Sequence, residues 1–179
     1  MTLEDYPWYA IAEGSALLQG DFFDRCPVLV PSGEIPEVSE GDEYTLDAYI
    51  VEYDVIVMSQ SCDLEQEKLD LVLVCPHWSL EEFAQQNDFF KSRKGKEELR
   101  RGNIPGYHVL QKCNLEEWQR SIRVVDFRNV YSLPYPFLKQ LAAKRGQRLR
   151  LMPPYREHLS QAFARFFMRV GLPVPIDMT

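Results

Sequence analysis

Two short apolar runs, residues 55–58 (VIVM) and 71–74 (LVLV), constrain the fold more than any other feature of the sequence. Every position in both runs is apolar, which is typical of strands that are buried on both faces. The polar stretch that joins them, SQSCDLEQEKLD, is long enough to reverse the direction of the chain. We therefore expect two adjacent, buried, antiparallel strands, with Cys62 and Asp63 at the turn that follows the first.

The chain is long enough for one domain with a sizeable core. It has 179 residues, of which 45% are hydrophobic and 12% aromatic, so we expect a single domain over residues 1–179. No run approaches the roughly 18 apolar residues of a membrane span, and the first residues, MTLEDYPWYA, lack the basic flank and apolar run of a signal peptide. These features favour a cytoplasmic protein with no membrane partner.

The other elements are predicted from apolar patterns and from glycine and proline. The expected strands are ALLQGDFFD, bent at Gly20, then CPVLVP, residues 44–59, LDLVLVCP, GYHVLQKC and SIRVVDFRNVYSL. The polar stretch between Pro31 and Asp47 is expected to be a long loop. SLEEFAQQNDFF is expected to form a helix with Ser79 as N-cap and Glu82 completing a capping box.

The second half of the chain carries three further helical predictions. KSRKGKEELRRG is expected to be a solvated helix or loop, because it is rich in bases and lacks the interleaved aromatic residues of a nucleic-acid surface. YPFLKQLAAKRG is predicted to be a helix that ends at Gly146. A C-terminal amphipathic helix is predicted over roughly residues 154–170, because Leu159, Phe163 and Phe166 recur at i, i+4 and i+7.

The net charge of −7 conceals a division of the chain into two halves. Residues 1–80 hold 17 acids and two bases, whereas the remainder holds 10 acids and 18 bases. One interpretation is that the two halves pack together and neutralise each other. The other is that an acidic surface binds a partner protein with a basic surface.

The acidic residues are densest in residues 32–54, which hold eight carboxylates and no lysine or arginine. The candidate partner-binding residues are Glu40, Asp42, Glu43 and Asp47. Nucleic acid is not the expected partner because the chain is acidic as a whole, and a homodimer is left open.

Four segments together resemble the MazF/PemK toxin family: ALLQGDFF, DVIVMSQSCDL, LDLVLVCPHWS and SIRVVDFRNVYSLPYPFLKQL. The resemblance implies an α+β fold in which a small antiparallel SH3-like β-barrel over roughly residues 15–145 carries added helices and the C-terminal amphipathic helix. The C-terminal segment, PYREHLSQAFARFFMRVGLP, is also similar to segments of uncharacterised bacterial proteins, and that similarity brings no activity with it.

The resemblance also implies a chemistry, because toxins of this family cut single-stranded RNA. In that family an arginine just before the strand that corresponds to DVIVMS stabilises the negative charge that develops on the RNA phosphate. Here Glu52, Tyr53 and Asp54 occupy these positions, and the two carboxylates would repel phosphate. A hydroxyl is available at Ser79 and a base at His77, so these two are the candidate catalytic residues. We expect a non-catalytic interaction or regulatory module of a bacterial conflict or stress system, such as a toxin–antitoxin pair, with endoribonuclease as the alternative.

A second alternative is a metal-binding or thiol protein. The candidate metal ligands are Cys62, Cys75, His77 and Cys113. Their spacing differs from the paired Cys-x-x-Cys turns of zinc knuckles and ribbons, so no cofactor is expected. In a chain without a secretory signal, the default for each cysteine is a buried, reduced thiol. Cys62 is then expected to pack at the strand end, with Asp63 accepting hydrogen bonds from turn amides.

Overall fold

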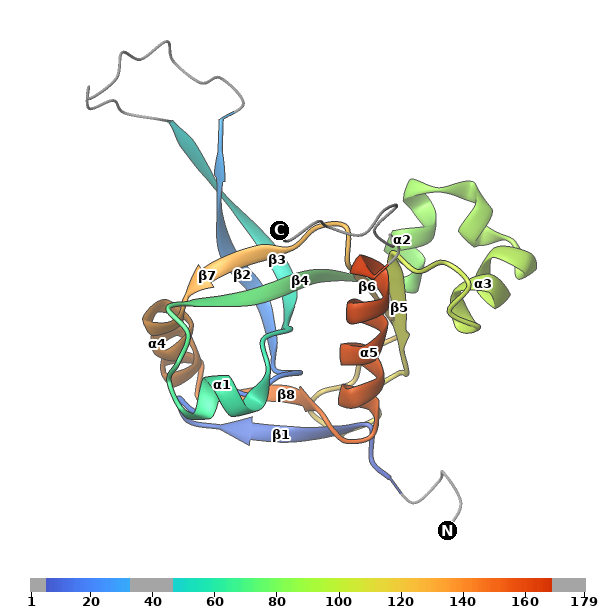
Figure 1. Cartoon of the computed structure of the whole chain (residues 1–179). Helices are drawn as coiled ribbons and strands as arrows, with labels where there is room; N and C mark the ends of the chain where they lie inside the picture. Colours follow the sequence, from blue (N-terminus) through green and yellow to red (C-terminus); the bar gives the residue numbers. More distant parts are fainter. Residues whose placement is uncertain (1–5, 33–46, 169–179) are drawn as a thin grey trace, which may run out of the picture.

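The computed structural model describes residues 6–32 and 47–168. The strands are β1 (Tyr9–Glu13), β2 (Phe22–Pro31), β3 (Ala48–Val57), β4 (Leu71–Ser79), β5 (Tyr107–Leu110), β6 (Arg123–Asp126), β7 (Tyr131–Pro134) and β8 (Gln147–Leu151). The helices are α1 (Ser61–Glu65), α2 (Leu80–Gln86), the 3-10 helix η2 (Asp88–Lys91), α3 (Arg93–Arg100), α4 (Tyr135–Arg145) and α5 (Tyr155–Phe167). The class is therefore α+β, as predicted (Figure 1).

The strands form two antiparallel sheets. β1 pairs with β8, and the larger sheet has the order β2-β3-β4-β6-β5, with β7 also pairing with β4. An isolated bridge between Asp21 and Arg150 connects the two sheets. Neither sheet closes on itself within the described residues, so this part of the chain forms no closed barrel. The SH3-like barrel stays a prediction.

The two apolar runs are adjacent antiparallel strands, as predicted. Ile56 of β3 lies opposite Cys75 of β4, and residues 55–58 are buried throughout. Leu71 and Leu73 differ from the prediction because they are 53% and 39% exposed. Only one face of this part of β4 is covered, so the second run alternates between core and surface.

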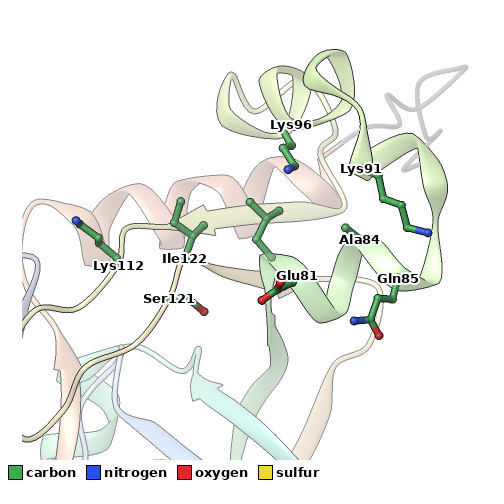
Figure 2. A pocket seen from close by; sticks show the side chains of 9 residues that line it. Glu81, Ala84, Gln85, Lys91, Lys96, Lys112, Ser121 and Ile122 are labelled. Carbon is green, nitrogen blue, oxygen red and sulfur yellow. The ribbon is translucent and has the colours of Figure 1, made fainter.

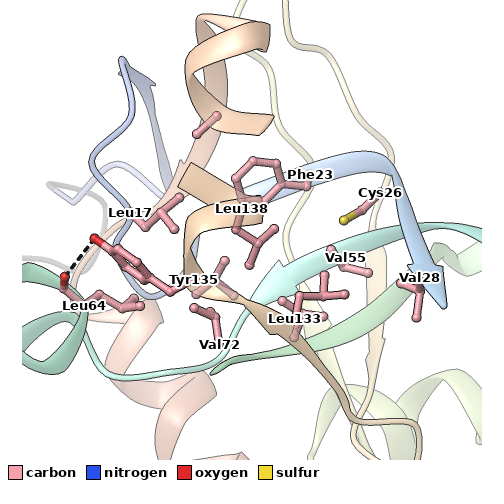
Figure 3. Close-up of a cluster of buried hydrophobic side chains, with 13 residues drawn as sticks. Leu17, Phe23, Cys26, Val28, Val55, Leu64, Val72, Leu133, Tyr135 and Leu138 are labelled. Atoms are coloured by element: carbon pink, nitrogen blue, oxygen red, sulfur yellow. Dashed lines mark hydrogen bonds between the residues drawn. The ribbon is translucent and has the colours of Figure 1, made fainter. Parts of the chain in front are cut away.

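One hydrophobic core lies between the larger sheet and α4 (Figure 3). Its buried side chains include Phe23 of β2, Val55 of β3 and Leu138 of α4. At the edge of this core the Tyr135 hydroxyl donates a hydrogen bond to the Leu64 carbonyl oxygen at 3.2 Å, which ties α4 to α1 (Figure 3). Burial of these apolar side chains is the main stabilising contribution to this half of the molecule.

A second core lies beneath α5, which confirms the predicted C-terminal amphipathic helix. Leu159 is fully buried, and Phe163 and Phe166 contact the ring of Phe127 from the sheet. The described helix spans Tyr155–Phe167, close to the predicted bounds. Figure 1 shows α5 running beside β5 and β6.

The other predicted helices are present as well. Ser79 caps α2 through a capping box with Glu82, and α4 ends at Gly146, whose φ of 76° suits glycine. The basic segment forms α3, and this helix packs closely on η2. A Cβ atom added to Gly95 would lie 2.1 Å from the Phe89 carbonyl oxygen, so only glycine fits there.

The predicted strand over ALLQGDFFD is present only in residues 22–24, which begin β2. β1 lies earlier in the chain, residues 14–20 form bends, a turn and irregular backbone, and β2 runs from Phe22 through the whole of CPVLVP. The register of β2 shifts between Phe23 and Cys26, where Arg25 has a φ of 45°. The pairing of β1 with β8 was not predicted. Most of the predicted loop between Pro31 and Asp47 lies outside the described residues.

No helix among the described residues is long and apolar enough to cross a membrane.

Candidate functional site

His77 lies inside the protein, with 1% of its surface exposed. Its Nδ1 accepts a hydrogen bond from Arg123 Nε at 3.0 Å, and its Nε2 has no hydrogen-bond partner among the described residues. Burial, followed by the charges of Arg123 and Arg120, holds the pKa of His77 well below its usual range. His77 is therefore a neutral core residue that solvent scarcely reaches.

The Ser79 hydroxyl is occupied by the capping box at the start of α2. Ser79 Oγ donates to Glu82 Oε2 at 2.7 Å and accepts from the Glu82 backbone N–H at 3.1 Å. These hydrogen bonds lower the pKa of the Glu82 carboxyl group. The only proton of this hydroxyl is thus held by a carboxylate, and the contacts match the N-cap interpretation of Ser79.

Glu52 and Asp54 stand where the MazF/PemK family has an arginine, and each pairs with an arginine from another strand. Arg25 of β2 pairs with Glu52 at 2.7 Å, and Arg123 of β6 pairs with Asp54 at 2.9 Å. Asp54 also accepts from the Arg25 backbone N–H. Two of the eight carboxylates in residues 32–54 are therefore paired within the chain. The sequence did not reveal this, because 69 residues separate Arg123 from Asp54.

The same pattern recurs elsewhere among the described residues, where several basic residues of the second half pair with acids of the first. The pairs are Arg120 with Asp24, Arg123 with Asp54, Lys139 with Glu67, and both Arg148 and Arg150 with Asp21. Asp21 is fully buried, and Arg148 Nε lies 2.8 Å from its carboxylate. Part of the negative charge of residues 1–80 is therefore neutralised by basic residues of the second half.

The cysteines do not come together. Cys26, Cys75 and Cys113 are buried, whereas Cys62 is exposed. The expectation that Cys62 packs at the strand end is wrong, because the chain forms helix α1 there and Cys62 lies on its solvent side. Within residues 6–32 and 47–168 no group of three or more His, Cys, Asp or Glu is arranged to hold a metal ion, so the candidate ligand set is not assembled.

Asp63 also differs from its predicted role. Its carboxylate lies 3.7 Å from Cys62 Sγ, and Gln60, not Asp63, is the N-cap of α1, without a side-chain capping bond.

Burial raises the pKa of Cys26 to about 11 and that of Cys75 to about 12, so these two thiols stay protonated at neutral pH.

The most unusual exposed surface belongs to the β2–β3 arm, which we define as residues 27–31 and 48–52. The two strands project from the body (Figure 1). Leu29 lies directly opposite Ile50, and these side chains are 65% and 71% exposed. Tyr49 beside them is 66% exposed. We call the side of the arm that carries Leu29 and Ile50 its outer face.

Of the four predicted partner-binding residues, one belongs to the part of the chain that the structure describes. Asp47 is exposed next to β3. Glu40, Asp42 and Glu43 lie outside the described residues, so their role stays a prediction.

A groove beside α2 is a second candidate site, and it was not predicted. It has a volume of about 570 Å³ and an apolar floor that includes Leu80, Ala84 and Ile122. Lys91, Lys96 and Lys112 stand around this floor (Figure 2). Lys91 is paired with Asp88 at 2.6 Å, and Glu81 also lines the groove, which reduces its positive charge.

The chain matches no protein-family model, no curated protein and no solved structure.

Proposed function

We propose that the protein is a non-catalytic protein-interaction module that docks through the outer face of the β2–β3 arm. The partner is a protein whose apolar patch is rimmed by lysine and arginine. The placement of this module in a bacterial conflict or stress system, and its SH3-like barrel, rest on the motif resemblance to the MazF/PemK family and belong to the same proposal.

The main support for this proposal is the exposure of Leu29 and Ile50, which face each other across the arm. An antiparallel sheet that packs on a core with one face normally presents polar side chains on the other. Here Val28 is buried on the inner face, yet the outer face is apolar as well. Covering Leu29 and Ile50 would contribute roughly 1–2 kcal/mol each.

The arm is better suited to docking by its face than by strand addition. β2 contains Pro27 and Pro31, and proline lacks the backbone N–H that an added strand would need. A two-stranded ribbon is also only marginally stable in water without further packing. A partner that covers the outer face would supply that packing.

Charge supports the chemistry of the partner. Residues 32–54 contain eight carboxylates and no base, and exposed Asp47 directly precedes β3 at the end of the arm. Although Glu52 and Asp54 are neutralised within the chain, the remaining acids favour a surface rich in lysine and arginine. A non-catalytic role is supported by the burial of His77 and by the occupied Ser79 hydroxyl.

A matched pair of double variants tests the proposal. Leu29→Thr with Ile50→Thr removes the apolar outer face but keeps residues that favour strands, whereas Leu71→Thr with Leu73→Thr makes the same change at exposed positions of β4. We expect a partner from the source cells to be retained by the wild type and by the β4 variant, and lost from the arm variant. Equal retention by all three proteins, or loss from the β4 variant alone, contradicts the proposal.

The two alternatives are tested with the same protein. The proposal expects single-stranded RNA to remain intact after incubation with the wild type. Cleavage that disappears in Ser79→Ala would favour the ribonuclease, and one equivalent of zinc per chain would favour the metal protein.

A further inference from the structure

A cavity of about 540 Å³ lies between the end of α3, strand β5 and helix α5. We call it the histidine–arginine cavity, because His108, His158, Arg100, Arg101 and Arg165 line it. It is distinct from the arm and from the groove beside α2. Its volume falls in the range of small-molecule sites, roughly 300–1,000 Å³.

Helix α5 presents two different sides. Leu159, Phe163 and Phe166 pack into the second core, whereas His158, Gln161 and Arg165 line the cavity. The second set recurs at i, i+3 and i+7, so it forms one continuous stripe along the helix. The same packing that fixes the apolar side of α5 therefore holds the polar stripe over β5.

The charges of the cavity favour an anion. Arg100 and Arg101 share Glu97, with contacts of 2.7 Å and 2.6 Å, and together the three carry one net positive charge. Arg165 has no hydrogen bond or ion pair to any other described residue. His158 is exposed at the cavity, so its ring can donate to an anion from the same side as Arg165.

His108 adds a second imidazole at the floor. Burial and then the charge of His158 lower the pKa of His108 to about 4, so its ring is neutral at pH 7. A neutral imidazole still has one N–H to donate. An anion bound between the two rings would offset the charge of His158, which adds to burial in disfavouring protonation of His108.

We propose that the histidine–arginine cavity binds a small phosphate ester. Arg165 and Arg101 would contact the phosphate, because the guanidinium fork matches its oxygens, with His158 as a further donor. Leu99, Val109 and Ala162 also line the cavity and would contact the apolar or aromatic body of the ligand. A long polyanion fits less well, because the net charge of −7 repels it outside the cavity.

The three histidines of the chain allow a direct test by NMR of their ring protons. Sodium phosphate should shift the His108 and His158 signals in a saturable way and leave the signal of buried His77 in place. Adenosine monophosphate should bind more tightly than phosphate, because it adds contact with the apolar lining. Arg165→Gln should weaken binding of the monophosphate by about tenfold or more.

Lys96→Gln is the control, because it removes the same charge from the groove beside α2 and should change the affinity by less than about twofold. If Arg165→Gln also moves the His77 signal, Arg101→Gln replaces it as the test. The proposal that this cavity binds phosphate is overturned if the His108 and His158 signals do not shift, or if Lys96→Gln weakens binding of the monophosphate as much as Arg165→Gln does. Much tighter binding of a single-stranded RNA oligonucleotide than of the monophosphate contradicts the proposal that the ligand is a small phosphate ester.

Discussion

Leu29 and Ile50 face each other across the β2–β3 arm, and about two thirds of each side chain is in contact with solvent, 65% and 71% respectively. Their neighbour Val28 points to the opposite face and is buried. The arm is thus apolar on both faces, although its own core covers only one. Exposed apolar surface of this kind is typical of interaction sites, and it is the basis of the proposed function.

Charge reversal tests whether the acidic residues of the segment 32–54 contribute to docking. We expect reversal of Glu40, Asp42 and Glu43 to lysine to slow association with the partner, and the wild-type association rate to fall with salt, because steering between opposite charges is screened. Reversal of Lys91, Arg93 and Lys94 should matter less. If this second variant is the one that loses binding in a surface plasmon resonance measurement, the basic segment is the contact and the acidic model is wrong.

Asp21→Asn should lower the free energy of unfolding by about 3–5 kcal/mol. Asp21 is fully buried between Arg148 and Arg150, and the variant leaves these guanidinium groups without their carboxylate. Asp88→Asn breaks an exposed pair with Lys91 and should change stability far less, because solvent screens exposed ion pairs. Urea denaturation of both variants distinguishes the two cases, and similar losses would argue against a structural role of the buried network.

One of the four thiols should react with a thiol reagent in the native protein. Cys62 is exposed, whereas Cys26, Cys75 and Cys113 are buried, and burial raises the pKa of Cys75 to about 12. We expect rapid modification of one equivalent with Ellman's reagent, none in Cys62→Ser, and all thiols after unfolding. Rapid modification of a second thiol in the native state would contradict the described packing.

His108 should make the protein less stable in acid. Its pKa in the folded state, about 4, lies below the value of about 6.5 expected in the unfolded chain. The unfolded state therefore binds more protons between these values, and stability falls as the pH decreases from about 6.5 to 4, by at most about 1.4 kcal/mol per pH unit.

His108→Gln removes this contribution, while the contribution of His77 remains in both proteins. The stability difference between wild type and variant, measured by urea denaturation, should be constant above about pH 7.5 and shift in favour of the variant below about pH 6. A difference that does not depend on pH would mean that His108 has an ordinary pKa.

The sequence predicted the elements whose signals are local. The apolar runs located β3 and β4, the spacing of Ser79 and Glu82 located the start of α2, and the recurring Leu159, Phe163 and Phe166 located α5. These signals depend on neighbours within a few residues, so they can be read without knowledge of the fold.

Features that depend on distant contacts were missed. β1 and β8 pair across more than a hundred residues, and nothing in either short segment indicates the other. Arg123 neutralises Asp54 only because β4 brings β6 and β3 to its two edges. The histidine–arginine cavity combines α3, β5 and α5, so its residues have no common sequence motif.

Site-specific photo-crosslinking shows directly whether the outer face of the arm is the docking surface. A benzophenone amino acid would replace Ala48, which is exposed and lies on the same face of β3 as Ile50, or Phe137, which is 36% exposed on α4. The proposal predicts that irradiation in the source cells joins the arm position, and not the α4 position, to a protein with a basic surface. Adducts at the α4 position with none at the arm, or an arm adduct that joins two copies of this chain, would contradict it.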